Sequence, residues 1–143
     1  AEINTGTDTG RVLVVDQFVA SNRNLYQRAV KVLDSTTAHT VSTTVGGDFR
    51  IPFTGTLTAI GAWVDTAGTT GVATIDVNLN GTTLMAATKI TIDSTEKTSV
   101  TAATAPVLST TAVTVDDIFT VDIDGLQTTA AKGLAVWLNI RKT

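Results

Sequence analysis

The sequence contains no cysteine, a single histidine and only two prolines among its 143 residues. Without cysteine, neither a disulfide framework nor a thiolate zinc site can form, so burial and strand pairing must hold the fold together. Threonine, a β-branched residue that suits the exposed face of a strand, supplies roughly one residue in five. With 11 glycines beside the few prolines, this composition is typical of an all-β protein rather than a disordered one.

Charged residues are also scarce, at 16% of the chain against about a quarter in average soluble domains. The formal net charge is −3, so the sequence lacks the basic footprint of a nucleic-acid-binding domain. Its apolar runs are too short to span a membrane, and residues 1–6 lack the basic and apolar regions of a signal peptide. We therefore expect no nucleic acid and no membrane as a partner, and synthesis and assembly in the cytosol.

The residue pattern divides the chain at about residue 47. Residues 1–47 are irregular and are predicted to form an N-terminal arm and attachment segment, ahead of a domain at 48–143. Two predictions compete for residues 22–33. Apolar residues at helical spacing behind an Asn24–Gln27 capping pair indicate a short helix. The alternation of apolar and polar residues later in the same segment indicates a strand instead.

Residues 48–143 alternate between apolar and polar side chains in several segments. Segments 72–79, 117–125 and 133–141 each carry their apolar residues on one face. The Asn-Gly dipeptide at 80–81 is the strongest short hairpin signal, because both residues tolerate a positive φ. Strand candidates recur about every 8–12 residues. The sequence therefore predicts an all-β fold, an antiparallel β-sandwich or jelly roll with an extended N-terminal arm.

Five short turn and strand motifs follow one another in this second part. They are Arg50–Phe53 (RIPF), Thr66–Gly71 (TAGTTG), Lys89–Ser94 (KITIDS), Thr101–Pro106 (TAATAP) and Val121–Leu134 (VDID to AKGL). Through these motifs about two thirds of the chain resembles a group of small bacteriophage virion proteins. The resemblance implies a β-sandwich or jelly roll in a phage particle, as a head decoration (cement) protein, a head fibre or a tail fibre-like module. The first 47 residues do not share it.

No group of residues predicts catalysis or metal binding. His39 would have to serve any Ser-His-Asp triad, but no Gly-x-Ser-x-Gly elbow accompanies it, and we expect an exposed polar histidine. The densest acidic group could offer oxygen ligands to Ca²⁺, although solvated carboxylates on a strand face fit the pattern better. Its members are Asp116, Asp117, Asp122 and Asp124. Asp65, Asp76, Asp122 and Asp124 are candidates for a glycosidase pair by residue type only. We therefore predict no enzymatic activity, no cofactor and no metal.

Two sets of residues are candidates for contact with a partner. In the first part, basic residues alternate with apolar ones, which suits either docking on an acidic protein surface or a solvated face. In the domain, Trp63 and Trp137 fall on the minority faces of their strands. They could anchor a subunit interface, which we favour, or form a platform for a sugar. The candidate capsid or subunit contacts are Arg23, Leu25, Tyr26, Arg28, Lys31, Trp63 and Trp137.

The function predicted first is that of a capsid decoration protein, which binds the assembled phage head and stabilises it. Its expected partners are the major capsid protein and further copies of itself, as a dimer or trimer. Its expected location is the virion, after assembly in the host cytoplasm. The alternative is a tail or head fibre module that binds a host receptor or a carbohydrate.

Overall fold

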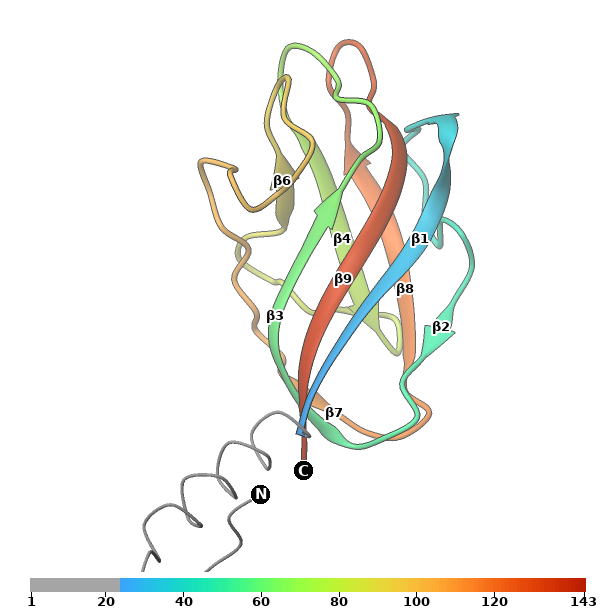
Figure 1. Ribbon diagram of the computed structural model, residues 1–143, viewed down its shortest axis with the longest axis vertical. Coiled ribbons are helices and arrows are strands. Elements are labelled where there is room, and N and C mark those ends of the chain that lie inside the picture. Colours follow the sequence, from blue (N-terminus) through green and yellow to red (C-terminus); the bar gives the residue numbers. More distant parts are fainter. Residues whose placement is uncertain (1–23) are drawn as a thin grey trace, which may run out of the picture.

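The computed structural model describes residues 24–143, and this part of the chain is built from strands without a helix (Figure 1). All strand pairs are antiparallel. The strands are β1 (Leu25–Ala38), β2 (Phe49–Arg50), β3 (Gly55–Trp63), β4 (Ala73–Leu79), β5 (Thr82–Thr83), β6 (Ile90–Ile92), β7 (Ala112–Val113), β8 (Ile118–Gly125) and β9 (Lys132–Lys142).

The strands form two sheets that enclose one core. The first sheet has the order β1-β9-β3-β7, and the second has the order β2-β8-β4-β5 with β6 paired to β4. Figure 1 shows β1, β9 and β3 side by side in front of β4 and β8. The buried core joins the two sheets through Leu57, Ile60, Val136, Leu138 and Ile140 on one side and Ile75, Val77, Phe119, Val121 and Ile123 on the other. The predicted antiparallel sandwich is confirmed, while the jelly-roll topology stays a prediction.

Strict alternation explains why the second sheet closes over the core. In β8, Phe119, Val121 and Ile123 are fully buried, while the residues between them are not. The predicted hairpin follows β4, where Asn80 and Gly81 have φ values of 50° and 82°. This turn pairs β4 with β5, as the sequence predicts.

The segment that could be helix or strand is a strand, so the helical prediction is wrong for residues 25–33. β1 pairs with β9 from Leu25 opposite Arg141 to Ala38 opposite Lys132. A helix here would leave the peptide groups along one edge of β9 without partners. The free-energy cost of those unpaired groups exceeds the stabilisation that a helix cap provides. Residues 25–38 of the predicted attachment segment therefore belong to the sandwich, and residues 1–23 lie outside the described residues.

One glycine at the start of β9 is required by both backbone and packing. Gly133 has a φ of +67°, and a Cβ built on it would lie 2.0 Å from Asp65 Oδ2. We expect Gly133→Ala to lower the free energy of unfolding by roughly 1–3 kcal/mol, from left-handed strain plus displacement of Asp65. Urea unfolding measures this, with Gly47→Ala as the matched control, because Gly47 has a φ of +82° and open space around it. Equal losses in the two variants would show that Asp65 contributes nothing.

Candidate functional site

Both tryptophans of the chain lie on the outer face of the first sheet. In β9, Val136, Leu138 and Ile140 are fully buried, so the residues between them, Trp137 and Asn139, face away from the core. Trp63, at the end of β3, keeps 38% of its surface exposed. The structure thus places both indoles outside the core, as the sequence predicts.

The ring of Trp137 lies over a glycine on the neighbouring strand. Gly61 of β3 is its partner in the register of the sheet, and Ala29 of β1 is its partner on the other side. A Cβ on Gly61 would be 2.4 Å from Trp137 Cζ2 and 2.8 Å from Ser99 Oγ. The absence of a side chain at Gly61 is therefore what lets the large indole lie down on the sheet.

The next row of the sheet carries two amide side chains. Gln27 of β1 lies opposite Asn139 of β9, and Ala59 of β3 completes the row. Rows on one sheet face are about 7 Å apart, so the amides flank the indole of Trp137. In the part of the chain that the structure describes, no hydrogen bond involves either amide side chain.

These two rows and Trp63 form an open hollow of about 520 Å³. Its lining consists of Gln27, Arg28, Ala29, Trp63, Trp137 and Asn139. A few polar groups placed among aromatic and small residues are typical of a site that binds a small ligand or a polymer segment.

An ion pair borders the hollow next to Trp63. Trp63 lies opposite Ala135, and Ala135 lies opposite Lys31 on β1. Lys31 Nζ binds the carboxylate of Asp65, just beyond the end of β3. Both side chains are more than one third exposed, so this pair contributes little stability. Lys31 and Asp65 thereby neutralise each other at this border of the hollow.

The alternation of β1 separates the predicted contact residues into two groups. Leu25 and Lys31 share the outer face with Trp63 and Trp137, because their register partners Arg141 and Ala135 share it. Tyr26 and Arg28 point to the other side of β1, where the facing residues of β9 are buried. The last predicted contact, Arg23, lies outside the described residues.

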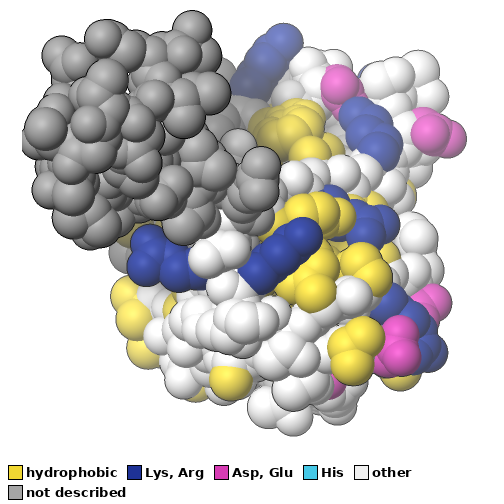
Figure 2. Space-filling view, turned by 60° about the horizontal axis from the view of Figure 1, so that its bottom comes forward, with side chains coloured by type: hydrophobic (Ala, Val, Ile, Leu, Met, Phe, Trp, Pro, Cys, Tyr) yellow, Lys and Arg dark blue, Asp and Glu magenta, His cyan; other side chains and the backbone are white. Residues whose placement is uncertain are grey.

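Tyr26 and Arg28 help to close one end of the sandwich. Tyr26 meets Phe53 edge to face at a centroid distance of 4.8 Å. The guanidinium of Arg28 lies 5.7 Å from the centroid of Phe49 and donates a hydrogen bond to the carbonyl of Arg50. Figure 2 views the molecule from this end and shows hydrophobic side chains interleaved with basic ones. The aromatic pair and the cation–π contact give Tyr26 and Arg28 a packing role.

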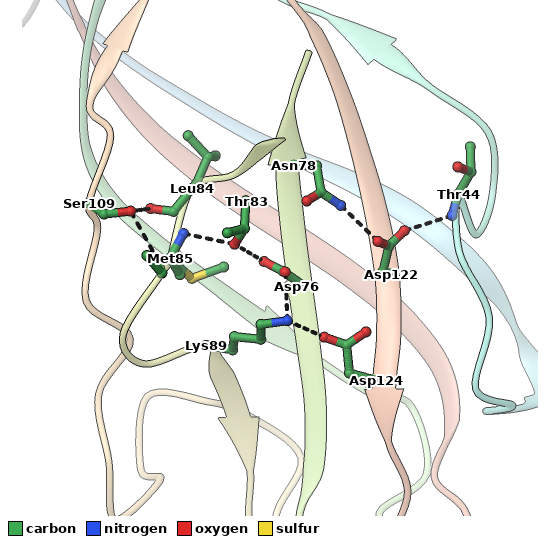
Figure 3. A network of polar contacts seen from close by, with 11 residues as sticks. Thr44, Asp76, Asn78, Thr83, Leu84, Met85, Lys89, Ser109, Asp122 and Asp124 are labelled. Carbon is green, nitrogen blue, oxygen red and sulfur yellow. Dashed lines mark hydrogen bonds and ion pairs between the residues drawn. The ribbon is translucent and has the colours of Figure 1, made fainter. Parts of the chain in front are cut away.

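The second sheet carries an outward-facing group of three carboxylates (Figure 3). Asp76 of β4 lies opposite Asp122 of β8, and Asp124 lies one row further. Lys89 Nζ binds Asp124 and lies 2.8 Å from Asp76 Oδ2. Asp76 is only 4% exposed and also accepts a 2.6 Å hydrogen bond from Thr83 Oγ1.

The carboxylate of Asp122 is also hydrogen-bonded within the fold. It accepts hydrogen bonds of 2.8 Å from the Thr44 amide and from Asn78 Nδ2. The hydrogen bonds that Lys89 donates to Asp124 and Asp76, together with the negative charges of these two carboxylates, raise the pKa of Lys89 far above its usual range, so this ammonium stays charged at neutral pH. The network therefore consists of carboxylates whose acceptor sites are used within the fold, which suits structural support better than acid–base chemistry.

The remaining acidic residues of the predicted cluster lie elsewhere. Asp117 accepts hydrogen bonds from the Thr114 amide and from Asn80 Nδ2, and these contacts lower its pKa. The neighbouring Asp116 is exposed. Over residues 24–143, no three His, Asp or Glu side chains converge in a way that could hold a metal ion.

His39 is buried, so the predicted exposed histidine is wrong. Only 2% of its surface is exposed, and its Nε2–H donates a 3.0 Å hydrogen bond to the carbonyl of Gly133. Nδ1 is buried without a partner in the described part of the chain. His39 follows β1 directly, and its amide bonds to the Ala131 carbonyl, so strand pairing draws the ring inward. A triad would require an accessible imidazole, and this one supports the start of β9.

Burial lowers the pKa of His39, because the charged imidazolium would lose its hydration, although the bond to Gly133 opposes this shift. A lowered pKa in the folded state means that the unfolded chain binds the proton more readily. Stability is then complete above the unfolded value of about 6.5 and is lost as the pH falls below it. We expect the stability difference between the parent protein and His39→Gln to shrink between pH 7.5 and pH 5 in urea unfolding. A constant difference would contradict this.

Comparison of the chain with protein-family models, with curated proteins and with solved structures finds no match. Among residues 24–143, none forms a helix of the length and apolar character needed to cross a membrane. The hollow of the first sheet and the polar network of the second are therefore the surface features that bear on function. Sequence reasoning identified the two tryptophans but missed Gln27, Asn139 and Gly61, which only the strand register places beside them.

Proposed function

We propose that this chain is a non-enzymatic structural protein of a bacteriophage particle that acts by surface contact. The observation that supports this most is the contrast between the two sheets. The first sheet leaves Trp63, Trp137 and Leu25 on its outer face, while the carboxylates of the second are engaged in internal hydrogen bonds. A surface of this kind suits binding and offers no free acid–base pair. The motifs at 50–53 and 121–134 resemble those of small phage virion proteins, and this resemblance supports the same proposal.

Decoration of the phage head is the first role in this proposal. A protein that binds the assembled lattice, but not free capsid subunits, stabilises the shell by mass action. Leu25, Trp63 and Trp137 would supply apolar anchors on the major capsid protein or on a further copy in a dimer or trimer. Lys31 would lie at the rim of that contact, as its ion pair with Asp65 does on the free sheet.

A fibre module that recognises a host carbohydrate or receptor is the second role. The feature that favours it is the hollow itself, because Gln27 and Asn139 set hydrogen-bonding amides beside the indole of Trp137. A subunit interface needs apolar area in this place, whereas a recognition site also needs directed polar groups.

Copy number in purified virions tests the proposal and separates the two roles. Quantitative mass spectrometry of the phage that encodes the chain should find it in the particle. A count in proportion to the capsid subunits, with rebinding to depleted heads and greater heat resistance of the heads, supports decoration. A few copies at the tail or at single head sites support the fibre role. Absence from the virion would overturn the proposal as a whole.

A further inference from the structure

We infer that the hollow of the first sheet binds a neutral saccharide, with a sugar ring stacked on Trp137 and its hydroxyl groups hydrogen-bonded by Gln27 and Asn139. This inference rests on the proposed function and specifies the ligand class of its recognition role. It follows from the placement of three side-chain types within two adjacent rows of one rigid sheet.

The indole of Trp137 is a prepared stacking surface. Its ring lies against the backbone at Gly61, and Ala29 flanks it on the other side, so both neighbours in its own row are small. The face of an aromatic ring is electron-rich, and the C–H groups on the face of a pyranose carry partial positive charge. A ring already fixed on a sheet loses little side-chain entropy when a ligand stacks on it. Trp63 offers a second aromatic surface at the border of the same hollow.

The amides match the chemistry of sugar hydroxyls. Each of Gln27 and Asn139 has two N–H donors and a carbonyl acceptor, and a hydroxyl both donates and accepts. The two side chains face each other across β1 and β9 in the row next to Trp137. A sugar ring over the indole therefore has hydrogen-bonding groups beside its rim rather than beneath its apolar face.

The charges around the hollow favour a neutral sugar over an acidic one. Lys31 is neutralised by Asp65. Arg28 lines the hollow, but its guanidinium donates to the Arg50 carbonyl and lies over the ring of Phe49 on the other side of the strand. Arg28 is the only charged residue among those that line the hollow, so no lining cation is directed at the indole to bind a carboxylate. The volume of about 520 Å³ lies within the usual range of ligand sites, roughly 300–1,000 Å³.

Tryptophan fluorescence tests this inference directly, because the chain has only two tryptophans and both line the hollow. The full chain is titrated with neutral tetrasaccharides of glucose, galactose, mannose and N-acetylglucosamine. We expect at least one of them to shift the emission saturably and to reduce quenching by acrylamide. Trp137→Ala should weaken that binding by about tenfold or more, with Trp63 as the remaining reporter.

Two further variants separate a lost contact from a lost fold. The double variant Gln27→Ala with Asn139→Ala alters side chains on the sheet surface and keeps both tryptophans. It should also weaken saccharide binding by about tenfold. Val107→Ala is the control, since Val107 is 51% exposed outside the hollow, and it should bind as the parent does.

Three results would overturn the inference. The first is that no saccharide of the panel protects the tryptophans, and the second is that Trp137→Ala binds as tightly as the parent. The third is protection from acrylamide without sugar together with an oligomer that Trp137→Ala dissociates in sedimentation, which would make the hollow a subunit interface. The copy number in virions is measured independently of saccharide binding. A failure to bind saccharide therefore leaves the proposed virion function intact, and absence from virions leaves the saccharide result unaffected.

Discussion

Deletion of residues 1–38 is expected to abolish cooperative folding, whereas deletion of residues 1–23 keeps it. The longer deletion removes β1, which is hydrogen-bonded to β9 along most of that strand. β9 is one of the two central strands of the first sheet, and its Val136, Leu138 and Ile140 are fully buried. Without β1, a long edge of peptide groups and the apolar side chains near it would meet water.

The measurement is urea unfolding followed by tryptophan fluorescence, with size-exclusion chromatography to detect aggregates. The chain lacking residues 1–23 retains every described pair between β1 and β9, so it serves as the matched control and should unfold in one transition. The chain lacking residues 1–38 should show no cooperative transition and should aggregate through the open edge. A soluble monomer of the shorter chain with an unchanged unfolding midpoint would show that residues 25–38 are an attachment arm after all.

The sequence predicts the inner strands of the sandwich more clearly than it predicts the edge strand β1. Segments 72–79 and 117–125 were predictable because apolar and polar residues alternate in both, which places the apolar set on the face that packs on the core. β1 is a sheet edge whose inward residues include Tyr26 and Arg28, so its apolar signal is weak. The helical spacing of its apolar residues is a coincidence that pairing with β9 overrides.

The candidate site shows the same limit at the level of single residues. Alternation alone placed Trp63 and Trp137 outside the core, because each lies between sequence neighbours that face inward. The neighbours that give the hollow its chemistry come from register, which pairs Gln27 with Asn139 and Gly61 with Trp137 across more than 75 residues of chain in each case. No local pattern encodes those distances.

The burial of His39 and of Asp76 was hidden for the same reason. Both are polar residues at positions where the local sequence predicts exposure to solvent, and both become buried through partners far along the chain. His39 is covered where the start of β9 crosses the end of β1, as its bond to Gly133 shows. Asp76 is covered because Lys89 and Thr83 close over it.

Replacement of Lys89 by methionine is expected to give the largest loss of stability among single surface substitutions. Lys89 is the counter-ion of Asp76, whose side chain is only 6% exposed, and it also neutralises Asp124. Removing it leaves a buried carboxylate without a cation, which costs about 3–5 kcal/mol in a dry interior. Water reaches Lys89, which is 36% exposed, and Thr83 still donates to Asp76, so we expect a smaller loss of roughly 2–3 kcal/mol.

Urea unfolding at neutral pH measures this loss, with Lys97→Met as the matched control, since Lys97 is exposed and has no ion pair within the described residues. The double variant Lys89→Met with Asp76→Asn should recover much of the stability, because the amide needs no counter-ion.

The raised pKa of Lys89 determines how its contribution to the free energy of unfolding depends on pH. Its contribution is complete below the unfolded value of about 10.5 and is lost as the pH rises through the folded value, so the parent and Lys89→Met should converge only in strong alkali. A Lys89→Met protein as stable as Lys97→Met at pH 7 would show that solvent, rather than the ammonium, stabilises the Asp76 carboxylate.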